Sequence, residues 1–278
     1  MPDERPAPYL SVVIPAYNES ARIGDSLDRL TAWLAAPGRA GAPAVPGAPA
    51  RREGPVEIIV VDDGSADGTV AAVERTAAGL ARGADAQAAG SVTLRLLRNG
   101  VNHGKGYSIK HGVLLAAGRF ILLSDADFST PIDELPRLLG PVAAGECDLA
   151  IGSRGMAASN IEVRQPFWRE GMGRTFNKIV RGVTGLPFTD TQCGFKVMRR
   201  EPVLPLFRAA RIERFAYDVE ILYLARKVGL AVREIPVRWK NAPGSKVHAV
   251  RDSFSMLCDV ARIVARDRSG RYGRLGEK

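Results

Sequence analysis

The sequence predicts an α/β protein with a mostly parallel central sheet flanked by helices. Short apolar runs rich in β-branched residues alternate with amphipathic segments over the first half of the 278-residue chain. This alternation is typical of a parallel sheet that is covered on both faces. Polar side chains also follow three of the runs, at the strand ends where open α/β sheets bind ligands.

The individual elements follow from these patterns. The sequence predicts strands over 10–16, 57–63, 92–99, 119–127 and 147–154, and helices over 23–34, 69–80, 106–118 and 132–145. The Pro/Gly/Ala-rich segment 36–54 has no periodicity, so we expect a disordered insertion there. In the second half, "TDTQCGFKVMRR" indicates a loop followed by a strand, and "ERFAYDVEILYLARKVG" indicates a helix. The whole chain, 1–278, is expected to form a single domain.

Composition limits the classes of partner and compartment. The chain has 39 basic and 30 acidic residues, so its charge of +9 favours anionic partners. The cysteines Cys147, Cys193 and Cys258 are too far apart for a zinc site, and we expect reduced core thiols in a cytoplasmic protein. No apolar stretch approaches the ~18 residues of a membrane span, so any contact with the cell membrane is expected to be peripheral, on its inner face.

Two carboxylates, Asp125 and Asp127, follow the fourth strand in "LLSDADFSTP". On an extended segment, side chains two residues apart point the same way, so both carboxylates can face one cation. One or two carboxylates completed by diphosphate oxygens are the usual Mg²⁺ or Mn²⁺ arrangement. The strand ends "PAYNES" and "VDDGSADGT" carry further acidic groups, which either bind a nucleotide or cap the following helices.

Together these motifs resemble the GT-A-type inverting nucleotide-sugar glycosyltransferases of family 2. "NHGKGYSIKHG", "TDTQCGFK", "RFAYDVEIL" and "GSKV" are most similar to the branch that glucosylates dolichyl or polyprenyl phosphate. The resemblance runs from about residue 10 to 259 and implies a GT-A, Rossmann-like fold with an acceptor-side extension. It implies a nucleotide-sugar half over 10–154 and an acceptor half over 155–267, with UDP-glucose as donor.

The resemblance also implies roles for individual residues. Nucleotide-sugar contacts are expected from Pro15, Tyr17, Glu19, Asp62, Asp63, Lys105, Asp125 and Gln192. The metal is expected on Asp125 and Asp127, and catalytic roles on Asp190, Asp218 and Arg154. Gly194 is expected to permit close backbone approach.

An acceptor phosphate changes what the site must supply. An alcohol acceptor needs a general base, whereas a phosphate monoester is largely a dianion near neutrality and needs cations instead. The expected cations are Arg154, Arg164, Arg169 and Lys246, whose side chains suit phosphate.

The segment 164–185 leaves the membrane question open. At helical spacing, Trp168, Phe176 and Val183 share one face, and Lys178 and Arg181 lie on the opposite one. Such a basic amphipathic helix either lies in a bilayer interface or packs its apolar stripe on the core.

Two other functions fit parts of the pattern. One is a glycosyltransferase of the same architecture that acts on a small soluble phosphorylated or hydroxyl acceptor. The other is a non-catalytic nucleic-acid-binding protein, which the charge of +9 allows, although no recognition motif is visible.

Overall fold

A computed structural model of the chain describes residues 7–36, 54–83, 92–163, 167–241 and 249–273. The strands are β1 (Leu10–Ala16), β2 (Val56–Asp62), β3 (Val92–Arg98), β4 (Phe120–Leu123), β5 (Leu149–Ser153), β6 (Asn160–Val163), β7 (Lys196–Arg199), β8 (Val232–Pro236) and β9 (Arg238–Lys240). The helices are α1 (Ile23–Ala35), α2 (Thr69–Gly83), α3 (Lys105–Leu115), a 3-10 turn η1 (Ile132–Glu134), α4 (Leu135–Ala143), α5 (Phe167–Thr184), α6 (Arg200–Ala209), α7 (Tyr217–Lys227) and α8 (Ala249–Arg268).

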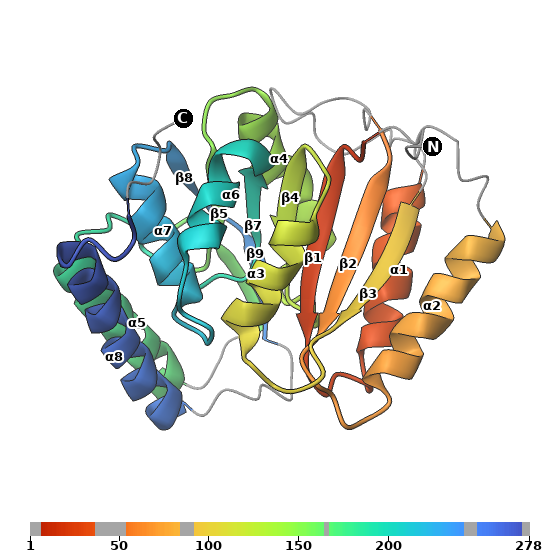
Figure 1. Ribbon diagram of the computed structural model, residues 1–278, viewed down its shortest axis with the longest axis horizontal. Helices are drawn as coiled ribbons and strands as arrows, with labels where there is room; N and C mark the ends of the chain where they lie inside the picture. The colour runs from red at the N-terminus through yellow and green to blue at the C-terminus, as the bar shows by residue number, and fades with distance from the viewer. Residues whose placement is uncertain (1–6, 37–53, 84–91, 164–166, 242–248, 274–278) are drawn as a thin grey trace.

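A mixed seven-stranded sheet runs through the molecule in the order β3-β2-β1-β4-β7-β5-β8 (Figure 1). β1 pairs in parallel with β2 and β4, β2 with β3, and β5 with β8, while β7 lies antiparallel between β4 and β5. Leu123 at the end of β4 and Ile151 of β5 both pair with Lys196, where β7 begins. The carboxyl ends of β1, β2, β4 and β5 therefore meet the start of β7 at one edge.

Helices cover both faces of this sheet because its central strands are apolar on both sides. Val13 and Val61 face a cluster that includes side chains of α3, α5, α6, α7 and α8. Val12 and Val60 face a second cluster, with side chains of α1, α2 and α4. The near-continuous apolar runs of β1 and β2 are what a doubly covered parallel sheet requires.

The predicted fold class is confirmed, and the five strands predicted in the first half all exist. The fourth is shorter than expected: β4 ends at Leu123, and residues 126–127 form a turn. The extended geometry that we expected for Asp125 and Asp127 is therefore wrong. Almost all of segment 36–54 lies outside the described residues, so its expected disorder remains a prediction.

The helix predicted over 164–185 exists as α5. Part of its apolar stripe is buried in the core, and part is exposed. Phe176 and Val180 are buried in the core, but Ile179 is 40% and Val183 47% exposed. The side chain of Trp168 lies outside the described residues. Packing on the core therefore accounts for only part of the stripe.

The structure also describes the cysteines and the lengths of the helices. Cys147 and Cys193 are buried free thiols as predicted, whereas Cys258 is only half-buried. Among the helices of the described ranges, none is both long enough and apolar enough to span a bilayer.

Candidate active site

The polar residues predicted from the sequence gather at the edge where β1, β2, β4 and β5 end and β7 begins. Asp62 and Asp63 lie at the end of β2, and Asp125 and Asp127 follow β4. Arg154 follows β5 directly. The common direction of these four strands thus brings together side chains that are far apart in the sequence.

Asp125 forms the centre of this cluster. Its carboxylate contacts the ammonium of Lys105 at 2.5 Å, and Lys105 begins α3. Gly194, in the loop before β7, lies so close that a Cβ there would be 2.6 Å from the Asp125 Cγ. The predicted close approach at Gly194 is confirmed, and its partner in this structure is the Asp125 side chain. Burial would raise the pKa of Asp125, but Lys105 lowers it on balance.

Asp127 has a different environment. One of its oxygens accepts a hydrogen bond from the Ser129 amide at 2.9 Å, and the other lies 3.9 Å from a guanidinium nitrogen of Arg22. Burial and the negative charge of Asp125 raise the pKa of Asp127. The two carboxylates therefore repel each other, although they stand in a loop and not on a strand.

The residues present fit a hard divalent cation. The described part of the chain has no group of three or more His, Cys, Asp or Glu side chains that could hold a metal ion. A site of two carboxylates, completed by the oxygens of a diphosphate, does not require such a group. Burial and then the negative charge of Asp125 raise the pKa of Asp127, and a cation would compensate that charge.

Asp63 is almost fully engaged within the protein. Its oxygens accept hydrogen bonds from the Asn99 amide at 2.8 Å and from the backbone amides of His103 at 3.1 Å and Gly104 at 2.8 Å. Asp63 therefore holds the loop that leads into α3. Among the described residues, the Asp62 carboxylate accepts long contacts of 3.3 Å from the Ser65 amide. A uridine contact by either carboxylate stays a prediction.

The residues after β1 form a second polar group. Pro15 is half-buried within β1, and Tyr17 is 40% exposed. Glu19 is paired with Arg22, which also approaches Asp127. The sequence reasoning missed Arg22, because the sequence does not show that it points back to the strand ends. A nucleotide contact by Pro15, Tyr17 or Glu19 stays a prediction.

Arg154 and Asp190 form a bidentate ion pair. The Arg154 Nε lies 2.6 Å and its Nη2 3.0 Å from the two Asp190 oxygens. The same carboxylate accepts the backbone amides of Arg154 and Gln192, each at 3.1 Å. Burial would raise the pKa of Asp190, but the guanidinium lowers it to about 2. The guanidinium also lies 5.6 Å from the centre of the Trp239 ring, a contact that no motif indicated.

Asp218 is the second predicted catalytic carboxylate, and it lies at the start of α7. It is 4% exposed and pairs with Lys196 at 2.5 Å. Lys196 also donates to the Cys193 carbonyl at 2.5 Å. Burial raises the pKa of Asp218, and Lys196 offsets this only in part. Lys196 was missed, although its place two residues after Gly194 was a usable signal.

Several predicted residues are not tested by this structure. Arg164 and Lys246 lie outside the described residues, as does the side chain of Arg169. The side chain of Gln192 is described, and its amide contacts the Met256 sulfur of α8 at 3.7 Å. The acceptor-phosphate and sugar roles of these residues stay predictions.

Comparison with known proteins gives the class of the chain. Residues 11–207 match the family described as "Glycosyl transferase family 2". The chain is 32% identical to a dolichyl-phosphate beta-glucosyltransferase of Dictyostelium discoideum, over 92% of this chain and 73% of that protein. It is 35% identical to one of Drosophila melanogaster, over 95% of this chain and 77% of that protein.

Solved structures agree on the fold. A crystal structure of glucosyl-3-phosphoglycerate synthase from Mycobacterium tuberculosis, in complex with Mn²⁺, UDP-glucose and glycerol 3-phosphate, superposes with a TM-score of 0.57. It is 20% identical and covers 95% of this chain and 80% of that one. At that identity the likeness concerns the fold alone, which is the GT-A fold.

The chain belongs to glycosyl transferase family 2. It is therefore an enzyme, a hexosyltransferase, and not the non-catalytic nucleic-acid-binding protein that its charge alone allowed.

Proposed function

We propose that the chain transfers glucose from UDP-glucose to a polyprenyl phosphate such as dolichyl phosphate, using Mg²⁺ or Mn²⁺ and inverting the anomeric carbon. The names of its relatives support the lipid phosphate as acceptor. The Mn²⁺ and UDP-glucose in the similar crystal structure support the metal and the donor. The enzyme would then work at the surface of the membrane that carries its acceptor.

The observation that carries the acceptor class is the state of Asp190. A general base works best when its pKa lies near the working pH. The Arg154 ion pair holds the pKa of Asp190 at about 2, which makes this carboxylate a weak base. A phosphate acceptor needs no base: its oxygen attacks the sugar carbon, the bond from that carbon to UDP breaks, and no proton moves.

In this proposal, some residues of the candidate site bind the donor and others bind the acceptor. Lys105 places an ammonium at the N-terminus of α3, a suitable setting for the donor diphosphate. Asp125 and Asp127 would hold the metal, which offsets the charge that develops on the departing UDP. Arg154 uses only part of its hydrogen-bonding capacity on Asp190, so it can also bind the acceptor phosphate.

A small soluble phosphorylated acceptor is the second candidate. It is favoured by the likeness to glucosyl-3-phosphoglycerate synthase, whose name gives such an acceptor. Arg154 would bind either phosphate. The distinction depends on whether a lipid is attached to that phosphate.

An initial-rate assay with UDP-glucose tests the proposal. Purified protein is incubated with Mn²⁺ and either a short-chain polyprenyl phosphate or the corresponding polyprenol. We expect transfer to the phosphate alone, and loss of transfer in EDTA or after Asp127→Ala. Transfer to the polyprenol at a comparable rate would contradict the acceptor class and would make Asp218, with its raised pKa, the candidate base.

A further inference from the structure

The helices α5 and α8 carry apolar side chains both on the side that packs on the core and on the side that faces solvent. The two helices lie side by side at one end of the molecule (Figure 1). Phe176 and Val180 of α5 are buried in the core, together with Val260 and Ile263 of α8. These residues account for the attachment of the pair to the rest of the fold.

The outer side of the pair exposes further large apolar side chains. Phe254 is 71% exposed, Val183 47% and Ile179 40%. Along α8, Phe254 begins a series at helical spacing that continues with Cys258, Ala261 and Ala265, of which the two alanines are exposed and Cys258 is half-buried. This outer stripe is separate from the stripe that packs on the core.

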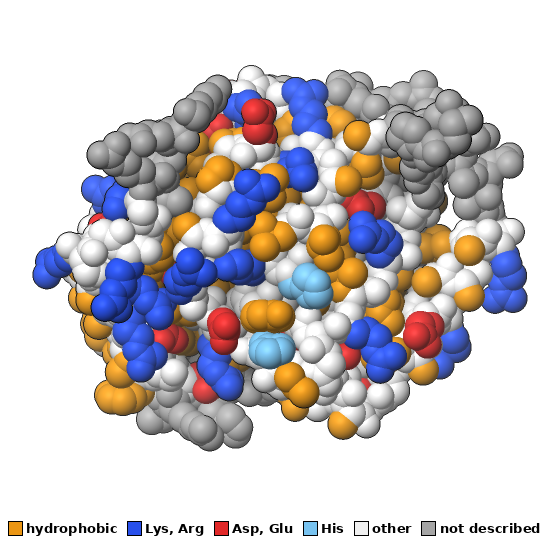
Figure 2. Space-filling view, viewed as in Figure 1, with side chains coloured by type: hydrophobic (Ala, Val, Ile, Leu, Met, Phe, Trp, Pro, Cys, Tyr) orange, Lys and Arg blue, Asp and Glu red, His pale blue; other side chains and the backbone are white. Residues whose placement is uncertain are grey.

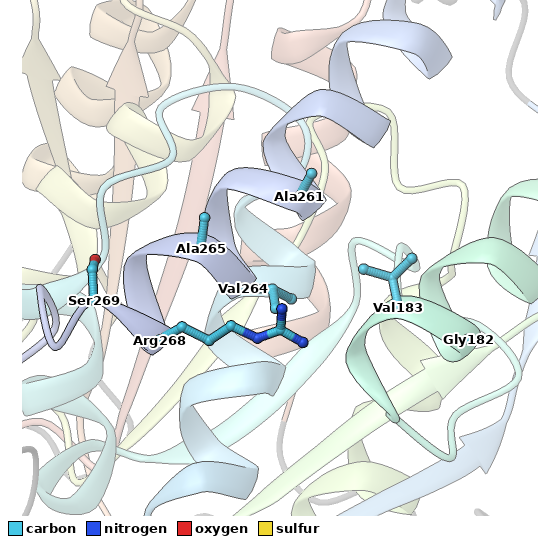
Figure 3. Close-up of a pocket in the computed structure, with 7 residues that line it drawn as sticks. All are labelled: Gly182, Val183, Ala261, Val264, Ala265, Arg268 and Ser269. Carbon is cyan, nitrogen blue, oxygen red and sulfur yellow. The ribbon is translucent and has the colours of Figure 1, made fainter.

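Between the helices lies an open groove of about 740 Å³. Figure 3 shows Val183 of α5 across from Val264 of α8, with the Arg268 side chain extended towards the space between them. The walls are formed mainly by apolar or small side chains, and one cation lies at the end. Together, the outer stripe of α8, the groove and the exposed side chains of α5 form one surface, which we call the α5–α8 face.

Most of the charges on the two helices around this face are basic; the acidic exceptions include Glu170 of α5, whose side chain lies outside the described residues, and the half-buried Asp252 of α8. Lys178 and Arg181 on α5 and Arg262 and Arg268 on α8 are exposed, and residues 171–184 contain no acidic side chain. On α8, Asp259 is 7% exposed and pairs with Arg262. Asp267 pairs with Lys227 of α7, on the inner side. Figure 2 shows Lys and Arg side chains gathered on this part of the surface.

We propose that the α5–α8 face docks the enzyme onto an anionic lipid bilayer. An exposed apolar stripe flanked by cations is the pattern of helices that lie in the bilayer interface, and the positive charge complements anionic headgroups. The proposal rests on the proposed function for its purpose, since a polyprenyl phosphate presents its phosphate at that interface. α8 connects the two regions, because its Met256 contacts Gln192 of the site at 3.7 Å.

Vesicle binding without any substrate tests docking separately from catalysis. The full chain is co-sedimented with two kinds of vesicle, one of phosphatidylcholine alone and one in which about a quarter of the lipid is phosphatidylglycerol. Neither polyprenyl phosphate nor UDP-glucose is present. We expect binding to the anionic vesicles that weakens as salt is raised. The double variant Phe254→Glu/Val183→Glu should bind about tenfold or more weakly.

A matched control is Leu115→Glu, which changes a 44% exposed apolar residue on α3. It should bind vesicles like the wild type, whereas an equal loss would overturn the assignment to the α5–α8 face. Failure of the wild type to bind anionic vesicles would overturn docking itself. Transfer to a short-chain acceptor in detergent, measured in parallel, would still report on the proposed function.

Two further measurements distinguish loss of docking from misfolding and from a change in self-association. Circular dichroism should show that the double variant is folded, and its transfer to the short-chain acceptor should match the wild type. Sedimentation velocity should show the same oligomeric state for both proteins. A wild-type dimer that the double variant turns into a monomer would assign the face to a second copy of the chain and would overturn the lipid proposal.

Discussion

Arg154 has two partners in the proposed acceptor site, the Asp190 carboxylate and the acceptor phosphate. It neutralises Asp190, which is 2% exposed, and its guanidinium has further N–H donors that can meet an incoming phosphate. A planar guanidinium suits this double role because it can bind two oxygen groups at fixed angles. The proposed acceptor site thus contains the Arg154–Asp190 ion pair, whereas the proposed donor site contains the Lys105–Asp125 contact.

Replacing Arg154 should weaken the use of the acceptor and leave binding of the donor nucleotide nearly unchanged. We expect Arg154→Ala to raise the KM for a polyprenyl phosphate about tenfold or more, a loss of ~1.4 kcal/mol or greater. UDP affinity, measured by calorimetry with Mn²⁺, should change little. The comparison variant Asp190→Asn should lower transfer more mildly. If Asp190→Asn instead abolished transfer while UDP binding was retained, an alcohol acceptor would be indicated.

Asp190 should also contribute to stability in a way that depends on pH. Its pKa in the folded protein is about 2, below the ordinary 3.8, so the folded state favours the charged form. The resulting stabilisation, about 2 kcal/mol, is fully present above about pH 4 and is lost as pH falls towards 2.

Denaturant unfolding between pH 6 and pH 3 measures this contribution. The free energy of unfolding of the wild type should fall more steeply with acidification than that of Asp190→Asn, which has no carboxylate to protonate. Parallel curves for the two proteins would contradict the ion pair.

The loop before β7 and the first residue of β7 contact two acidic residues of the candidate site, which the sequence motif did not indicate. It supplies Gly194 against Asp125, and β7 then begins with Lys196, which pairs with Asp218. The antiparallel direction of β7 is what brings its first residue to the same edge as the ends of β4 and β5.

Gly194→Ala should therefore disable the proposed metal site without unfolding the protein. Its Cβ would meet the Asp125 carboxylate, so that carboxylate would have to move. We expect Mn²⁺ binding in the presence of UDP, followed by electron paramagnetic resonance, to weaken about tenfold or more. Gly79→Ala is the control, since a Cβ on that α2 residue meets nothing within 4 Å. Equal Mn²⁺ affinity in both variants would contradict this role of Gly194.

Local patterns predicted the elements of the first half well, because each strand there is a nearly continuous apolar run. Patterns could not predict how the chain turns after β4. Asp125 and Asp127 were expected on an extended segment, yet residues 126–127 turn and Phe128 has a φ of 46°. The two carboxylates are still close enough to interact, because contacts with other parts of the fold position them. Those contacts depend on the tertiary structure and cannot be inferred from the local sequence.

The candidate site was predictable where a motif named its residues, and not where a partner came from elsewhere. Asp125, Arg154 and Asp190 were each predicted from motifs. Their contacts with Lys105 and Trp239, and the pairing of Asp218 with Lys196, depend on strand order and on the direction of β7. Neither the order of the strands in the sheet nor the direction of β7 can be inferred from single segments of the sequence.

As a whole, the molecule separates its chemistry from its proposed lipid contact. The reactive side chains lie at one edge of the sheet, and the α5–α8 face lies at one end of the fold (Figure 1). α8 belongs to both regions, because its Met256 contacts Gln192 beside the candidate site. The charge of +9 serves both tasks, since donor, acceptor and anionic bilayer are all negative.

The most direct test of the central claim is a competition between the two acceptor classes. Purified wild type is given UDP-glucose, Mn²⁺ and equal concentrations of a short-chain polyprenyl phosphate and 3-phosphoglycerate, and the products are quantified by mass spectrometry. Proton NMR then assigns the anomeric configuration of the main product. We predict β-glucosyl polyprenyl phosphate as the main product. A main product of glucosyl-3-phosphoglycerate, or an α-linked lipid product, would contradict the proposed function.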